Sequence, residues 1–492
     1  MKKNAGRIVT LVLFGALLAS CGGEAAAPDE SVSQNSAAVG TETAAEEAPE
    51  EASVIAAEDF GGRKINIMTY GWNDYMTSTP DVAAADYTGD GINDAVYDRN
   101  AALAEKFNIE LTYTDTEGNF ASLLKNSVLA DDGAYDLAFL SATGASTQGL
   151  NGCLMDVHAL PNLALDKPWW NSSLLNSSSI AGVNYFLIGD MNVGTWTQSY
   201  AVYFNKKLAQ DLDMPDLYDI VNTGKWTIDE LDTLTRRVYQ DLNGNGEYDE
   251  NDLYGLTACS VCVDCFWASA DVNFVVSDGD ALTLQFTDTY YGLWDKMVSL
   301  LQAPEMLYTD RPQYTAKRDT YDRGAFLEDR ALFFMEGLCI ADTRLREMKS
   351  DYGILPLPKY DENQKNYRTY SHANNNSTVA FPVTAEKDID MLTKVVEDMA
   401  YFSSKTVRPA YYEKLLSGKI ARDENSIAML DIITNNVVYD RAFLFLLSDL
   451  TQPLRAQITQ ANSAASYAEA NLSKNQKLLD KYTEQAKESK NQ

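Results

Sequence analysis

Alternating apolar and polar residues in the first part of the chain predict strands, and longer apolar periods predict helices between them. We expect strands at residues 64–70, 109–114 and 135–140, and helices at 94–107 and 121–129. This β-α-β-α-β order predicts an α/β fold with a parallel sheet covered by helices on both faces. Ligands of such sheets bind beyond the carboxyl ends of the strands.

Residues 195–208, TWTQSYAVYFNKKL, carry a short strand pattern near the middle of the folded chain. Tyr200, Val202 and Phe204 occupy alternate positions of a β-prone run, and Asn205 then ends the strand and opens a helix. The position of this strand suits a segment that runs from one domain into the next.

Further signals follow in the second half of the chain. Thr227 and Glu230 have the spacing of a capping box and predict the start of a helix. We also expect a strand at 331–335 that ends at Glu336 and Gly337, a strand at 377–383, a helix at 388–402, mainly helix after 409, and fraying at 486–492.

The order of these segments resembles that of the extracellular solute-binding proteins of ABC importers, the maltodextrin-binding type in particular. A strand that ends in Tyr-Phe-Asn-Lys-Lys-Leu is typical of that family, and YDLAFL (135–140), WTIDEL (226–231) and YGILPLP (352–358) resemble its other segments. The resemblance implies a two-lobe fold of the periplasmic-binding-protein type II class, with a hinge of crossing segments. It also implies a binding protein rather than an enzyme.

The same resemblance divides the chain. Residues 59–200 are expected to form the first part of lobe 1, and 201–354 the first part of lobe 2. Residues 355–405 return to lobe 1, and 406–492 form a C-terminal helical region that completes lobe 2.

The N-terminus has the pattern of a bacterial lipoprotein. Basic residues precede a short apolar run at 8–18, which cannot span a bilayer, and Leu-Ala-Ser-Cys21 then matches the lipobox. We expect residues 1–20 to be a signal peptide and Cys21 to carry the lipid that holds the protein on the cell membrane, facing outward. Residues 21–58, rich in Ala, Glu, Ser, Thr and Pro, predict a disordered linker.

Charge and composition exclude several functions. The formal net charge of −31 at pH 7 repels nucleic acid and anionic lipid. The chain has two histidines and lacks HExxH and GxSxG sequences, so metalloprotease and serine-hydrolase schemes have no residues to carry them. A glycosidase needs only two carboxylates, and composition leaves that alternative open.

The cysteines other than Cys21 are Cys153, Cys259, Cys262, Cys265 and Cys339. Their odd number rules out complete intramolecular pairing. A structural zinc site needs four ligands, and the 259–265 group has no matching partner group. We expect small buried thiols lining a helix, with a disulfide inside the group left open.

Residues 241–252 have the oxygen-donor spacing of a calcium loop. The donors at positions 1, 3, 5, 7, 9 and 12 are Asp241, Asn243, Asn245, Glu247 through its carbonyl, Asp249 and Asp252. We expect a structural Ca²⁺ here, although Asp at position 12, as in dockerin-like loops, weakens bidentate ligation. The alternative is an acidic Asn-Gly turn that binds no metal.

Sugar sites combine aromatic faces with carboxylates and amides that bind hydroxyl groups. Residues of these types at predicted loop ends are the candidate ligand contacts: Trp72, Asn73, Asp74, Ser141, Thr143, Trp196, Gln198, Asp264, Trp267, Glu336, Arg344, His372 and Asn374.

Core packing is the alternative for each aromatic residue among these candidates. We expect Trp169 and Trp170 at the surface or between the lobes, and Trp226 in the core. After Gly337, where the resemblance implies an aromatic ligand contact, this chain has Leu338 and Cys339.

These observations predict a lipid-anchored, monomeric substrate-binding protein of an ABC importer. It would close two lobes on a small solute, a mono- or oligosaccharide first, and present that solute to a membrane permease. The alternative is a surface glycoside hydrolase or other glycan-degrading lipoprotein, which needs two carboxylates about 5 to 10 Å apart. An adhesion protein docking through the calcium loop is disfavoured because the loop is not duplicated, and peptides or other polar metabolites stay open as ligands.

Overall fold

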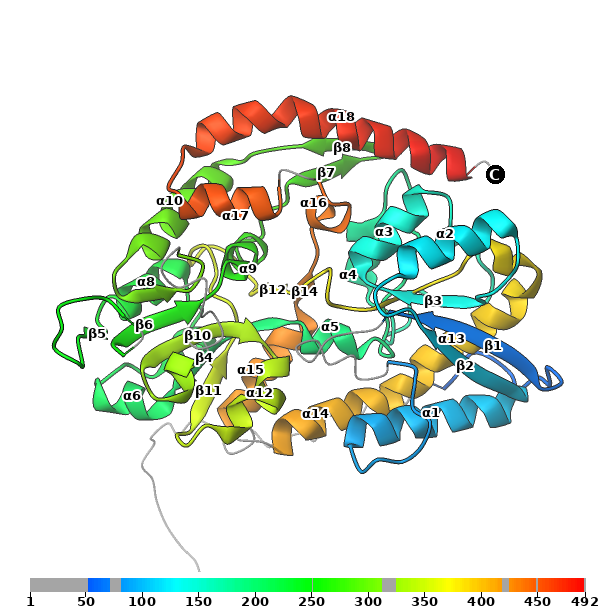
Figure 1. The fold of residues 1–492 in the computed structure, drawn as a ribbon, viewed down its shortest axis with the longest axis horizontal. Coiled ribbons are helices and arrows are strands. Elements are labelled where there is room, and N and C mark those ends of the chain that lie inside the picture. Colours follow the sequence, from blue (N-terminus) through cyan, green and yellow to red (C-terminus); the bar gives the residue numbers. More distant parts are fainter. Residues whose placement is uncertain are drawn as a thin grey trace, which may run out of the picture. The chain divides into compact units, whose positions relative to one another are not determined.

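Two separate β-sheets organise the chain, and each forms the centre of one lobe (Figure 1). The computed structural model describes residues 52–70, 81–249, 251–311, 324–417, 424–447 and 450–490. The predicted signal peptide, Cys21 and most of the predicted linker lie outside these residues. Within them, the structure contains no helix that is both long and apolar enough to cross a membrane.

The first sheet has the strand order β13-β3-β1-β2, and its edge strand β13 (Thr378–Ala380) is antiparallel to β3. β1 (Arg63–Thr69) pairs in parallel with β2 (Ile109–Asp115) and β3 (Leu137–Leu140), and α1 (Gly91–Phe107) and α2 (Phe120–Ala130) connect them. The predicted β-α-β-α-β unit is therefore confirmed, with boundaries that differ by a few residues.

Helices cover both faces of this sheet because its strands alternate their side chains. Ile67 and Phe139 belong to one buried cluster, together with Leu392 of α13 (Ile389–Lys405). Met68, the next residue of β1, belongs to the other cluster. The predicted parallel pairing with two covered faces is confirmed for β1, β2 and β3.

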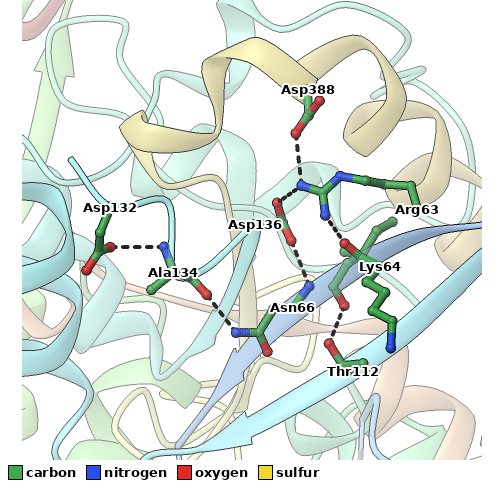
Figure 2. A network of polar contacts seen from close by, with 9 residues as sticks. Arg63, Lys64, Asn66, Thr112, Asp132, Ala134, Asp136 and Asp388 are labelled. Carbon is green, nitrogen blue, oxygen red and sulfur yellow. Dashed lines mark hydrogen bonds and ion pairs between the residues drawn. The ribbon is translucent and has the colours of Figure 1, made fainter.

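A polar network holds β1, β3 and the segment before α13 together (Figure 2). Nη2 of Arg63 contacts Asp136 at 2.8 Å and Asp388 at 2.9 Å. The second carboxylate oxygen of Asp136 accepts a hydrogen bond from the backbone N–H of Asn66 at 2.7 Å, and the Asn66 side chain donates to the carbonyl of Ala134 at 2.6 Å. Since Arg63 is partly exposed, the network contributes more to register than to stability.

The second sheet has the order β11-β4-β10-β6-β5, with β9 beside β6. β4 (Tyr200–Asn205) lies between β10 (Ala331–Gly337) and β11 (Tyr352–Leu355), antiparallel to both, and β6 (Leu253–Ala258) is parallel to β10. All residues of β4 are buried. The strand predicted in the middle of the chain is therefore a central strand of the second lobe.

Short elements complete both lobes. In the first lobe these are α3 (Ala142–Leu150), α4 (Ser172–Ser178) and α5 (Val193–Thr197). In the second they are α6 (Lys206–Asp211), α7 (Leu217–Asn222), α8 (Ile228–Thr235), α9 (Val261–Ser269), α10 (Asp288–Gln302), α12 (Cys339–Thr343), β5 (Tyr239–Gln240), β9 (Met306–Tyr308) and the hairpin of β7 (Val275–Asp278) and β8 (Ala281–Leu284). The predicted cap of α8 is confirmed, since the Thr227 side chain accepts a hydrogen bond from the N–H of Glu230 at 3.2 Å.

The last part of the chain contributes to both lobes. Its elements are β12 (Thr369–Tyr370), β13 (Thr378–Ala380), α13, α14 (Val407–Ser417), α15 (Glu424–Asn435), β14 (Val437–Val438), α16 (Arg441–Leu444), α17 (Gln452–Thr459) and α18 (Ala464–Lys490). β13 joins the first sheet antiparallel to β3, and α14 packs against α1 and α13. α15 packs against β11 of the second sheet, and α17 packs against α9 and α10.

The end of the chain is more ordered than expected. α18 continues to Lys490, and Ala486 is fully buried. Ser489 Oγ lies 3.0 Å from the hydroxyl of Tyr185. The expected fraying is wrong for residues 486–490, because α18 packs along β8 and α3 and so does not end free in solvent.

Trp169 and Trp170 are not surface residues. Both are almost completely buried in the first lobe, and their Nε1 atoms each donate a 2.9 Å hydrogen bond to Glu397 of α13. Glu397 also accepts from the N–H of Ala164 at 3.0 Å. The prediction of a surface pair is wrong because a buried carboxylate, distant in sequence, satisfies both indole groups. The inter-lobe alternative holds for Trp170 alone, which also lines a cavity next to residues of the second lobe. Trp226 is fully buried, as predicted.

The substitution Glu397→Gln is expected to lower the free energy of unfolding by about 1–3 kcal/mol, because an amide NH₂ group then faces an indole donor. Urea unfolding at neutral pH measures this loss. Glu386→Gln, which changes an exposed carboxylate near the start of the same helix, is the matched control and should stay within about 0.5 kcal/mol of the parent. Equal effects of the two substitutions would contradict the buried role of Glu397.

Candidate functional site

Three chain segments lie side by side where the chain passes between the lobes. Ser199, just before β4, forms an antiparallel bridge with Ser371, just after β12. β12 pairs in parallel with β14. β4 opens the second sheet, β12 leads back to β13 of the first sheet, and β14 leads from α15 to α16, which packs on α3 and α4. We call residues 198–200, 369–372 and 436–439 the hinge segments.

The first lobe presents polar side chains at the carboxyl ends of β1 and β3. Ser141 and Thr143 lie at the end of β3, as predicted, with their hydroxyl oxygens 3.4 Å apart. The hydroxyl of Thr143 donates to the side-chain oxygen of Asn374. Tyr70, at the end of β1, donates to the carbonyl of Asn376 at 2.6 Å. Three of the candidate residues therefore meet on this wall.

The second lobe presents a polar layer at the carboxyl ends of β6 and β10. Asp264 of α9 pairs with Arg455 of α17, whose Nε donates at 2.9 Å, and accepts from the hydroxyl of Tyr370 at 3.2 Å. Glu336 ends β10, and one of its carboxylate oxygens accepts from the N–H of Gly337 at 3.0 Å. The candidates Asp264 and Glu336 are thus on one wall, both buried.

Burial sets the charge state of this layer. It raises the pKa of Asp264, and the pairing with Arg455 offsets part of that shift. Burial lowers the pKa of His372 to about 4, with a further contribution from the positive charge of Arg455. His372 is therefore neutral at neutral pH, and Asp264 uses both carboxylate oxygens in contacts with Arg455 and Tyr370. An oxygen held in this way is poorly placed to act as a nucleophile.

The candidates Trp196 and Gln198 lie at the hinge. The Trp196 ring stacks on Tyr411 of α14 with a centroid separation of 5.4 Å, and only 7% of the residue is exposed. The carbonyl of Gln198 accepts from the N–H of His372 at 3.1 Å. This backbone hydrogen bond between two hinge segments places His372 next to Gln198, although the two residues are distant in sequence.

Other candidates do not join these walls. Trp267 is fully buried and stacks on Tyr290 at 5.3 Å, so it packs in the core of the second lobe and the ligand role predicted for it does not fit this structure. Arg344 is exposed at the end of α12. The candidates Trp72, Asn73 and Asp74 lie outside the described residues.

The thiols agree with the prediction of small buried groups. No disulfide is present in the described part of the chain. Cys339 is half-buried, and the other four cysteines there are buried: Cys153, Cys259, Cys262 and Cys265. Cys262 and Cys265 are part of α9, and burial raises the pKa of both thiols well above the usual value. They are therefore protonated and unreactive at neutral pH.

Asp81 binds the first residues of α5, the helix that precedes the first hinge segment. Asp81 was not among the predicted residues. Its carboxylate accepts from the backbone N–H groups of Val193 at 2.9 Å and Gly194 at 3.4 Å, and from the hydroxyl of Ser377. Burial raises the pKa of Asp81 to about 6. A carboxylate at the first residues of a helix supplies the acceptors that those N–H groups lack.

Sequence reasoning also missed Tyr70, Tyr370, Asn376 and Arg455. Tyr70 lies at a predicted strand end, so its position was a usable signal. No sequence signal pointed to Arg455, because its contact with Asp264 joins two helices that are distant in sequence.

The predicted calcium loop is wound around its own side chains. Asp241 accepts from the N–H groups of Gly244 at 2.7 Å and Gly246 at 2.8 Å, and both glycines have positive φ angles of 71° and 76°. The side-chain amides of Asn243 and Asn245 donate to Asp249 at 3.0 and 2.8 Å. In the part of the chain that the structure describes, no three His, Cys, Asp or Glu side chains converge as metal ligands. The NH₂ groups of Asn243 and Asn245, rather than their side-chain oxygens, therefore face the carboxylate of Asp249.

Comparisons with known proteins find the fold in solved structures. No family model matches the sequence, and no curated protein matches it. The chain is similar to the sugar-binding protein MalE of Xanthomonas citri, at 11% identity, with a TM-score of 0.57 over 87% of this chain and 99% of that one.

Two further solved structures are similar. One is the galacto-N-biose/lacto-N-biose I-binding protein of an ABC transporter from Bifidobacterium longum, in complex with lacto-N-biose, at 14% identity and a TM-score of 0.53 over 86% of this chain and 98% of that one. The other is an ABC transporter solute-binding protein from Agrobacterium radiobacter in complex with ribitol, at 11% identity and a TM-score of 0.51 over 85% and 99%. The predicted two-lobe fold is confirmed.

The substitution Asp264→Asn is expected to destabilise the protein by about 3–5 kcal/mol, because Arg455 would keep its charge in a buried site without a counter-ion. Asp271→Asn is the matched control. Asp271 follows the same helix and pairs with Arg368 at 3.2 Å, but both side chains are substantially exposed, so its loss should cost less than about 1 kcal/mol. Denaturant unfolding of the two variants measures the difference, and equal losses would show that the Asp264 pair is not structurally important.

Proposed function

We propose that this protein is the solute-binding component of an ABC importer, which closes two lobes on a carbohydrate or sugar alcohol and delivers it to a membrane permease. The observation that carries this proposal is the two-lobe arrangement, in which hinge segments join two sheets that have polar side chains at the carboxyl ends of their strands. Proteins that share this two-lobe arrangement are a sugar-binding protein and binding proteins in complex with lacto-N-biose and ribitol. None of these is an enzyme by name.

The chemistry of the walls supports a neutral, hydroxylated ligand. Ser141, Thr143 and Asn374 supply hydroxyl and amide groups on the first lobe. On the second lobe, the carboxylate of Asp264 is already paired with Arg455, so this ion pair offers no net charge to an ionic ligand. Groups that both donate and accept hydrogen bonds match the hydroxyls of a sugar.

Lobe closure follows from the arrangement of the hinge. A solute that contacts both walls binds the closed form more tightly than the open form and shifts the equilibrium toward closure. We further propose that Cys21 carries the lipid anchor and that the protein acts as a monomer on the outer side of the cell membrane. The lipobox sequence supports the anchor.

Thermal unfolding of the purified protein against a panel of mono- and oligosaccharides, sugar alcohols and peptides tests this function. A solute at 100 times its Kd should stabilise the native state by about 2.7 kcal/mol and raise the Tm accordingly. Asn374→Ala should weaken that binding, while Asn363→Ala, at an exposed turn of the second lobe, should not. Release of a cleaved product on long incubation would favour the glycoside hydrolase, and a response to peptides alone would overturn the carbohydrate class.

We also propose that residues 241–252 bind a structural Ca²⁺. The backbone already winds around Asp241, and rotation of the Asn243 and Asn245 amides would turn their oxygens toward the carboxylates of the loop. Such a loop can bind a hard cation with oxygen ligands at positions 1, 3 and 5. Its place in a turn between β5 and β6 gives the ion a role in stability rather than in solute binding.

Removal of calcium with a chelator is expected to lower the Tm of the parent protein, because the ion binds only the folded loop. The variant Asp241→Ala should start at the lower Tm and show no further effect of the chelator. Asp280→Ala, in the exposed turn between β7 and β8, is the control and should respond as the parent does. A parent protein whose Tm is the same with calcium and with chelator would show that the loop is a plain acidic turn.

A further inference from the structure

A cavity lies on the face of the hinge segments opposite to Tyr370. Val437 lines this cavity, whereas Val438 and Tyr370 line a smaller pocket. In the β12–β14 pair, Thr369 is registered with Val437, and Tyr370 with Val438. Successive residues of a strand point to opposite faces, so Val437 and Tyr370 face opposite sides of this ribbon. Tyr370 contacts Asp264 and marks the side of the candidate site.

Both lobes build this cavity, which has a volume of about 210 Å³. Trp170, Asn171 and Asp190 come from the first lobe, and Trp196 comes from the hinge helix α5. Asn435 ends α15, which packs on the second sheet. The cavity therefore spans the two lobes, with the hinge as one wall.

An ion pair with a long contact distance lines the cavity. Arg408, at the start of α14, lies 3.5 Å from the carboxylate of Asp190 and 3.3 Å from the side-chain oxygen of Asn435. Both contacts are long for charge-assisted hydrogen bonds, which are usually near 2.8 Å. Only 8% of Asp190 is exposed. Burial raises the pKa of Asp190 to about 6 even with Arg408 beside it, so this carboxylate gains from any further hydrogen-bond donor.

The charges select the class of ligand. An anion would meet the carboxylate of Asp190, and a cation would meet the guanidinium of Arg408. A hydroxylated neutral molecule can donate to Asp190 and accept from Arg408, and Trp170 and Trp196 add apolar surface to the same cavity. We propose that this cavity is a second binding site, specific for a small neutral polyol and separate from the site between the polar walls.

Occupation of this cavity is coupled to the position of the lobes. Asp190 belongs to one lobe and Asn435 to the other, so a polyol that contacts both binds one arrangement of the lobes better than another. By linkage, the polyol must then change the affinity of the solute site for the solute by a certain factor. The solute must change the affinity of the cavity for the polyol by the same factor.

Ligand-observed NMR of the purified protein with ribitol, sorbitol and glucose tests the proposal. At least one polyol should bind the parent protein. Asp190→Asn should weaken that binding by about tenfold or more, because the acceptor charge is lost. Ser173→Trp, which changes an exposed residue at the edge of the cavity and leaves the ion pair intact, should block it. Ser122→Trp, at an exposed position of α2, should have no effect.

The substitution Asn374→Ala separates this proposal from the function proposed above. Polyol binding that survives Asn374→Ala and is lost in Ser173→Trp supports the second site. Binding that is lost in Asn374→Ala and kept in both Asp190→Asn and Ser173→Trp overturns the second site and leaves the solute-binding function standing. Absence of polyol binding to the parent protein also overturns the second site. Thermal unfolding of each variant checks that the fold is retained.

Discussion

The structure depends on hydrogen bonding of the polar groups in the segments that cross between the lobes. Ser371 donates to the carbonyl of Thr195 at 3.1 Å, and the side chain of Asn376 donates to the hydroxyl of Tyr439 at 2.8 Å. Each unmet buried polar group would cost about 1–3 kcal/mol, so a crossing made of extended backbone and small polar side chains needs such partners. These bonds join the crossing segment that contains β12 to the segments that contain β4 and β14. Gln198, Tyr370 and His372 of the candidate site lie on the hinge segments themselves. The other site residues lie at strand ends or on helices of the two lobes: Ser141, Thr143, Asp264 and Glu336.

Buried charges follow the same principle. Asp264 pairs with Arg455, Glu397 accepts from two indole groups, and Asp81 accepts from the first N–H groups of α5. Asp264 and Glu397 lie within helices α9 and α13, and each of the three carboxylates joins its own element to another that is distant in sequence. The acidic chain can therefore bury several carboxylates and still leave neutral hydroxyl and amide groups on the first-lobe wall. That combination is consistent with a hydroxylated ligand and with the carbohydrate class proposed here.

Local pattern was enough to predict part of the strands and helices. The β1-α1-β2-α2-β3 unit, the central strand β4 and the Thr227 cap all depend on residues a few positions apart. The errors concern contacts over long sequence distances. Trp169 and Trp170 are buried by a carboxylate of α13, and α18 stays helical to Lys490 because another element covers it. For the candidate site, strand-end reasoning placed Ser141, Thr143 and Glu336 at the ends of β3 and β10, where the structure has them, and their role as ligand contacts stays a prediction. It could not distinguish Trp267, a core residue, from a ligand contact, because both uses of an aromatic ring have the same local sequence.

The central claim is that the two lobes close around a solute by bending at the hinge segments. Small-angle X-ray scattering of the purified protein, with and without a saturating solute, tests it most directly. Hinge closure predicts a smaller radius of gyration with solute, with a midpoint at the same solute concentration as the binding curve. A solute that saturates its site while the radius of gyration stays constant would contradict hinge closure, even though the fold and the polar walls remained as described.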